Sequence, residues 1–66
     1  MFNKEDYDNM IFALNVVIIK QRSIVRDAKS KNNDVLHQML PHFEEKLESL
    51  ETTKAMVVSE KERLFR

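Results

Sequence analysis

The absence of glycine restricts the fold of this chain more than any other feature of its sequence. Two-residue β-hairpin turns, β-bulges and phosphate-binding loops rely on glycine, because it reaches backbone conformations that a Cβ atom disfavours. Proline occurs only once, whereas leucine, lysine, glutamate, methionine and arginine, which all favour helices, are frequent. The sequence therefore predicts an all-α fold.

The length of 66 residues predicts a single domain, spanning residues 1–66, with only a small core. Domains of this size usually gain stability from disulfides, a structural metal or a partner chain. The chain has no cysteine, which excludes disulfides and thiolate-bound metal sites. We therefore expect the protein to associate with itself as a homodimer.

Residues 4–30 have the periodicity of one amphipathic helix. Mostly apolar positions, spaced alternately three and four residues apart, form a stripe with further apolar residues beside it. The stripe consists of Tyr7, Met10, Leu14, Val17, Gln21, Ile24 and Ala28, flanked by Ile11, Ile18 and Val25. Asn3 is suited to cap this helix, because its side chain accepts hydrogen bonds from backbone N–H groups of the first turn.

The polar segment "SKNND" at residues 30–34 predicts a turn at 31–33, followed by a second helix at about 34–64 with Asn33 or Asp34 as its cap. The stripe of the second helix consists of Leu36, Leu40, Phe43, Leu47, Leu50, Lys54, Val57, Lys61 and Leu64, widened by Met39, Val58 and Phe65. Its register continues across Pro41, which lies opposite the stripe. A single helix with a kink at Pro41 is therefore favoured over two shorter helices that meet there.

The distribution of charge favours antiparallel packing of the two helices. Near the turn the first helix is basic and the second acidic, and at the open end the signs are reversed. Near the turn, the basic residues of the first helix are Lys20, Arg22, Arg26, Lys29 and Lys31, and the acidic residues opposite them are Asp34, Glu44, Glu45, Glu48 and Glu51. At the open end, the acidic residues of the first helix are Glu5, Asp6 and Asp8, and the basic residues opposite them are Lys61, Arg63 and Arg66. We expect an antiparallel helical hairpin that dimerises into a four-helix bundle.

A second apolar stripe lies on the opposite side of the first helix, within the segment "MIFALNVVII" at residues 10–19. Phe12, Val16 and Ile19 follow the i, i+4, i+7 spacing and lie nearly opposite Leu14. Full burial of such side chains contributes about 1.5–3 kcal/mol each, and their exposure favours aggregation. We interpret these three residues as an interface, either with a second copy of the chain or with a different protein.

The sequence predicts no enzyme, no metal, no cofactor and no small-molecule substrate, because it contains no catalytic motif. His37 and His42 are five residues apart, so they point about 140° from each other on a helix and cannot bind one metal together. A metal site built on His42 and Glu45 would need carboxylates from other helices, and the apolar stripes contain none. The glutamates between residues 44 and 51 lack the pocket that would raise their pKa values for acid–base catalysis.

Arg22, Arg26 and Lys29 form a basic strip on the first helix through their i, i+4, i+7 spacing. The strip is a candidate surface for RNA or DNA, and a dimer that used it would be similar in architecture to the plasmid copy-control RNA-binding proteins. The formal net charge of zero and the acidic second helix make nucleic acid the less favoured partner.

The chain lacks a run of about 18 apolar residues, and its acidic N-terminal segment "MFNKEDYDN" differs from a basic signal peptide. We therefore expect a cytoplasmic protein that does not bind membranes. The many lysine, asparagine and isoleucine residues are typical of a phage or bacterial accessory protein. The expected function is a small non-catalytic protein–protein interaction module, such as a regulator, inhibitor or adaptor.

Overall fold

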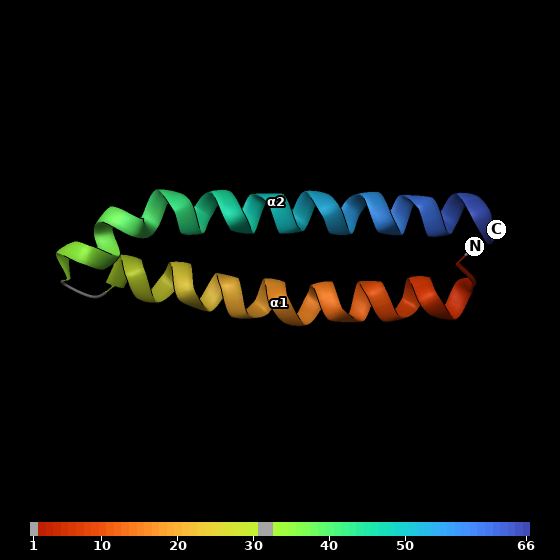
Figure 1. Ribbon diagram of the computed structural model, residues 1–66, viewed down its shortest axis with the longest axis horizontal. Coiled ribbons are helices and arrows are strands. Elements are labelled where there is room, and N and C mark those ends of the chain that lie inside the picture. Colours follow the sequence, from red (N-terminus) through yellow and green to blue (C-terminus); the bar gives the residue numbers. More distant parts are fainter. Residues whose placement is uncertain (1, 31–32) are drawn as a thin grey trace.

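The computed structural model describes residues 2–30 and 33–66, which form two α-helices and no strand. Helix α1 (Lys4–Ser30) and helix α2 (Asp34–Leu64) lie antiparallel and side by side (Figure 1). The hairpin is elongated, with principal extents of 47 × 16 × 15 Å. This architecture confirms the predicted all-α helical hairpin. Two residues of the expected turn, Lys31 and Asn32, lie outside the described residues.

Each helix is preceded by an asparagine whose side chain accepts hydrogen bonds from backbone N–H groups of the first turn. Asn3 Oδ1 accepts a hydrogen bond from the N–H of Asp6 (2.9 Å), and Asp6 Oδ2 accepts one from the N–H of Asn3 (3.0 Å). This reciprocal pair has the form of a capping box. Asn33 Oδ1 accepts hydrogen bonds from the N–H groups of Val35 (2.9 Å) and Leu36 (3.2 Å). Asn33 is therefore the cap of α2.

Helix α2 continues through Pro41 without interruption. Proline has no N–H to donate to the preceding turn, and its ring crowds that turn, so a bend is the expected response. Figure 1 shows the first turns of α2 inclined toward α1, at an angle to the rest of the helix. Pro41 itself is exposed, which places its ring on the solvent side of the helix.

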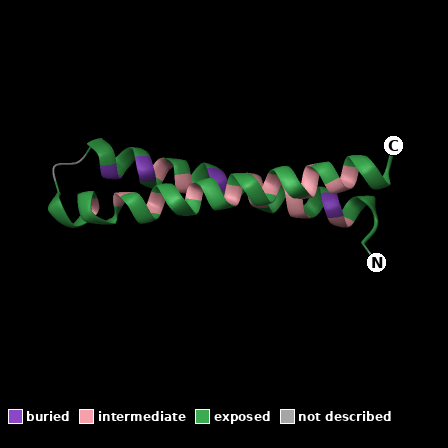
Figure 2. Cartoon of the chain, turned by 90° about the horizontal axis from the view of Figure 1, so that it is seen from above, coloured by how far each residue is buried: buried purple, intermediate pink, exposed green. Residues whose placement is uncertain are grey.

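The contact with α2 includes Tyr7 and Ala28 of the predicted stripe, but in the middle of α1 it is displaced by one residue from that stripe. The buried residues of α1 are Tyr7, Ile18, Val25 and Ala28 (Figure 2). Val17 and Ile24, which the stripe placed at its centre, are 44% and 43% exposed. The neighbouring positions Ile18 and Val25 take their place because α2 packs against that side of α1. Val17 and Ile24 therefore lie at the edge of the helix–helix contact.

The predicted stripe of α2 faces α1, but the contact leaves much of it uncovered. Every stripe residue from Leu36 to Lys61 is half-buried, and none of the described residues of α2 is fully buried. The accessible surface is 5317 Å², which is about 900 Å² more than the roughly 4,400 Å² of a compact monomer of 7.9 kDa. One side of a standard protein–protein interface measures about 800 Å². The excess surface of the hairpin is therefore comparable with one side of an interface.

Candidate interaction surfaces

The outer face of α1, formed by Phe12, Val16 and Ile19, is left uncovered by α2. The three side chains are 71%, 39% and 65% exposed, respectively. Their spacing of three and four residues makes them neighbours on the helix surface. The structure thus brings together the residues that the sequence analysis interpreted as an interface, and it leaves them accessible to another chain.

Among the described residues, three ion pairs join the two antiparallel helices. Arg22 Nη2 lies 3.4 Å from Glu51 Oε2, and Lys29 Nζ lies 3.6 Å from Glu44 Oε1. At the open end, Lys61 pairs with Asp8. All three join charges that the sequence placed opposite each other. Such exposed pairs contribute little to stability, about 0–1 kcal/mol, but they disfavour other arrangements of the helices.

The basic strip of α1 is largely occupied by contacts within the hairpin. Arg22 and Lys29 pair with glutamates of α2, and Arg26 Nη2 donates a hydrogen bond to Ser23 Oγ (3.3 Å). Affinity for nucleic acid depends on cations that can neutralise phosphates. Two of the three cations already face a carboxylate, which weakens the strip as a phosphate-binding surface.

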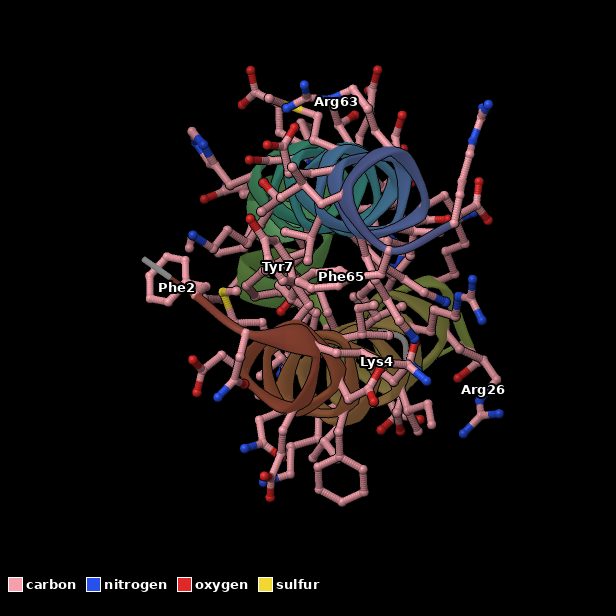
Figure 3. All side chains as sticks on the ribbon, turned by 90° about the vertical axis from the view of Figure 1, so that its right-hand side faces the viewer. Phe2, Lys4, Tyr7, Arg26, Arg63 and Phe65 are labelled. Atoms are coloured by element: carbon pink, nitrogen blue, oxygen red, sulfur yellow. The ribbon has the colours of Figure 1, made fainter. Side chains whose placement is uncertain are left out.

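Three aromatic rings close the open end of the hairpin. The ring centroids of Phe2 and Tyr7 are 6.0 Å apart, and those of Tyr7 and Phe65 are 5.7 Å apart, both in edge-to-face arrangements. Figure 3 shows Tyr7 and Phe65 between the two helices. Each such pair contributes about 0.5–1.5 kcal/mol beyond the burial of its area. The cluster therefore joins the segments before α1 and after α2 to the helical core.

Gln21, the polar member of the predicted stripe, bonds across the helix–helix contact. Its Nε2 atom donates a hydrogen bond to the backbone carbonyl oxygen of Phe43 at 2.9 Å. A partly buried amide without a partner would be costly. The bond explains how this position remains in the stripe without an apolar side chain.

The ion pair at the open end makes stability depend on pH. A hydrogen bond from Lys61 holds the pKa of the Asp8 carboxyl below its usual value. A carboxyl group whose pKa is lowered by folding stabilises the fold above its unfolded pKa, near 3.9, and loses this effect as the pH falls through the folded pKa.

We therefore expect Asp8→Asn to lower the free energy of unfolding slightly at pH 7 but not at pH 2.5. Urea unfolding followed by circular dichroism at both pH values measures the difference. Asp27→Asn serves as a control, because Asp27 forms no ion pair with any described residue. An equal effect of Asp8→Asn at the two pH values would contradict a stabilising role for the Asp8–Lys61 pair.

A second apolar surface runs along one side of the two helices. We call it the seam face; it consists of Phe2, Met10, Val17, Ile24, Met39 and Met56. At the open end, Phe2, Met10 and Met56 line one groove of about 370 Å³ together with Thr53 and Val57. Val17 and Ile24 follow Met10 at intervals of seven residues, which keeps them on the same line of α1. By the same rule Met39, fourteen residues before Thr53, lies on the line of Thr53 on α2.

The sequence pattern did not reveal the seam face. It assigned Met10, Val17 and Ile24 to the contact between the two helices and Met39 to the edge of the second stripe, and it did not single out Met56. In the structure the exposed fractions of the seam-face residues other than Met10 range from 41% for Met39 to 67% for Met56. The available signal was the width of the apolar arc, which exceeds the narrow contact line of a two-helix coiled coil.

The ion pairs of Arg22 and Lys29 with α2 lie on a different side of the hairpin from the seam face. Figure 3 shows Phe2 and Arg26 on opposite sides of the molecule. A groove on the side of these ion pairs is lined by four charged side chains and by Ser59 and three apolar ones; the charged residues are Arg22, Glu51, Lys54 and Glu62, and the apolar residues are Ile18, Ala55 and Val58. The seam face therefore provides an apolar surface that is not interrupted by the ion pairs between the helices.

The polar residues considered for catalysis or metal binding lie at the surface. His37, His42 and the glutamates at positions 44, 45, 48 and 51 are all exposed. Among the described residues, no group of three histidine, cysteine, aspartate or glutamate side chains is placed to hold a metal ion. Over the same residues, neither helix is long and apolar enough to cross a membrane.

Comparison of the chain with protein-family models, with curated proteins and with solved structures gives no significant match. The outer face, the seam face and the ion pairs between the helices are therefore the features from which a function is assigned.

Proposed function

We propose that the protein is a small non-catalytic protein–protein interaction module, a regulator, inhibitor or adaptor that works as a helical dimer in the cytoplasm. The observation that carries this proposal is the exposure of the outer face, where Phe12 and Ile19 are 71% and 65% accessible. Large apolar side chains at i, i+4, i+7 positions are the pattern by which a helix packs against another protein. A group of such side chains at the surface is typical of an interaction site.

The shape of the hairpin and the placement of its polar groups also support a role in binding rather than catalysis. Acid–base catalysis needs groups with perturbed pKa values in a pocket that excludes water. The exposed histidines and glutamates described above are not in such a pocket. Nucleic acid is the less favoured partner, because Arg22 and Lys29 already pair with glutamates of α2.

Two measurements test this proposal. Light scattering at micromolar concentration should give about twice the chain mass of 7.9 kDa. Tagged protein should capture a defined partner from an extract of its native cells, and Phe12→Lys combined with Ile19→Lys should abolish the capture while helicity is retained. A matched control adds two lysines at the same spacing of seven residues on exposed positions of α2, Thr52→Lys with Ser59→Lys.

The control variant should capture the same partner as the wild type, because its new charges lie away from the outer face. A monomeric wild type would contradict the proposed dimer. Capture that is equal for the wild type, the outer-face variant and the control would show that the outer face does not bind the partner.

A further inference from the structure

We infer that the dimer forms through the seam face, which a second copy of the chain covers, and that the outer face stays free for a different protein. The existence of a dimer rests on the proposed function, whereas its assignment to the seam face is new. The two apolar faces are separate surfaces of α1, so substitutions can test them independently.

The apolar arc of α1 has the width that two neighbouring helices require. The line through Ile11, Ile18 and Val25 faces α2, and the line through Val17 and Ile24 lies beside it at the edge of the contact. A two-stranded coiled coil uses one narrow line, whereas a helix in a four-helix bundle packs against more than one neighbour. The unused half of the arc therefore indicates a further helical layer on the seam side.

The amount of exposed surface fits a second copy. Compared with a compact monomer of its mass, the chain exposes about 900 Å² of additional surface, close to the roughly 800 Å² that each partner buries in a standard interface. The seam face extends over both helices, so a second hairpin can pack its own two helices on it. The opposite side of the hairpin carries the Arg22–Glu51 and Lys29–Glu44 pairs and is less suited to apolar packing.

The seam face is compatible with a two-fold axis that lies in the plane of this face and runs perpendicular to the helices. The ion pairs Asp8–Lys61 and Arg22–Glu51 show that Val17 and the region of Thr53 lie at a similar level along the hairpin. An axis through this level places Val17 against Val17 of the second copy. It also places Met10 against Ile24 of the second copy, because these residues lie seven positions before and after Val17.

The charges of α2 fit the same axis. Lys46 lies seven residues before Thr53, and Glu60 lies seven residues after it. The axis therefore brings Lys46 of one copy opposite Glu60 of the other, and symmetry repeats the pair. Glu60 lines the groove of the seam face and pairs with Arg63 of its own helix, whereas Lys46 forms no ion pair with any described residue. A second copy of the chain thus has complementary chemistry along both helices of the seam face.

The adjacent valines of α1 provide a matched test. Val17 is 44% exposed on the seam face, and Val16 is 39% exposed on the outer face. Val17→Asp places two carboxylates together at the axis and should weaken dimerisation at least 100-fold, measured by sedimentation equilibrium. Val16→Asp should leave the dissociation constant within about threefold of the wild type. Circular dichroism confirms that both variants remain helical.

A charge exchange tests the arrangement if Val17→Asp perturbs folding. Lys46→Glu and Glu60→Lys each create like-charge contacts in their own homodimers and should each weaken dimerisation about tenfold. Mixing the two variants should form a heterodimer with near wild-type affinity, because both symmetric contacts then join opposite charges. Native mass spectrometry distinguishes the heterodimer from the homodimers.

The possible failures of the two proposals differ. If the wild type is dimeric, and Val16→Asp dissociates the dimer whereas Val17→Asp does not, the seam-face assignment is overturned. The proposed dimer itself then stands. A mixture without preference for the heterodimer would overturn the two-fold arrangement. A monomeric wild type would overturn both the dimer and its assignment.

Discussion

Replacing Ile18 by alanine should lower the free energy of unfolding by about 2–5 kcal/mol, whereas the same replacement at Ile19 should change it by less than about 0.5 kcal/mol. Ile18 is 3% exposed, and Ile19 is 65% exposed. The first substitution therefore removes buried methyl groups and leaves a cavity between the helices. The second removes a side chain that solvent already surrounds.

The effect at Ile18 is large for a chain of this length. Typical stabilities of about 0.05–0.15 kcal/mol per residue correspond to roughly 3–10 kcal/mol for the whole protein. Urea unfolding at one fixed protein concentration, followed by circular dichroism, gives both values under the same conditions. Equal effects at the two isoleucines would mean that α2 does not pack against the line of Ile18.

The contrast between these neighbouring isoleucines shows what the sequence could predict. The spacing of apolar residues identifies two sides of α1, and it correctly separates Ile18 from Ile19 because they differ by about 100° on the helix. The capping role of Asn3 and the ion pairs between the helices were equally predictable. They depend on local hydrogen bonding and on the order of charges along the chain.

The line of closest contact was not predictable in the same way. Val17 and Ile18 are both large and apolar, and both lie within the arc that faces roughly toward α2. The pattern gives the width of this arc but not the number of helices that share it. Only the position of α2 shows that Val17 is left at the edge, and the seam face was missed for this reason.

Contacts at the open end of the hairpin also have no signature in the sequence. The spacing places Phe65 beside the stripe of the second helix, but it does not predict that Phe2 and Phe65, just outside the two helices, both contact Tyr7. Their edge-to-face contacts form because the ends of the hairpin meet. The hydrogen bond from Gln21 to the backbone carbonyl oxygen of Phe43 likewise joins the two helices and has no sequence signature.

Replacing Pro41 by alanine is expected to raise the free energy of unfolding by about 1–3 kcal/mol. Proline in a helix interior costs about 3 kcal/mol relative to alanine, because it lacks an N–H and crowds the preceding turn. Part of this gain is offset because alanine makes the unfolded chain more flexible, an effect of about 0.4–1 kcal/mol. Pro41 is exposed, so the substitution removes little packing.

Urea unfolding of Pro41→Ala and of the control Gln38→Ala measures this effect, since Gln38 is exposed on the same part of α2 and has a helix propensity close to that of alanine. If the bend is only a consequence of the proline ring, the free energy of unfolding of Pro41→Ala should exceed that of Gln38→Ala by at least about 1 kcal/mol. A loss of stability in Pro41→Ala would mean instead that the bend is needed for packing. It inclines the turn-side end of α2 toward α1, where Leu36 and Leu40 are half-buried, and a straight helix would draw both leucines away from that contact.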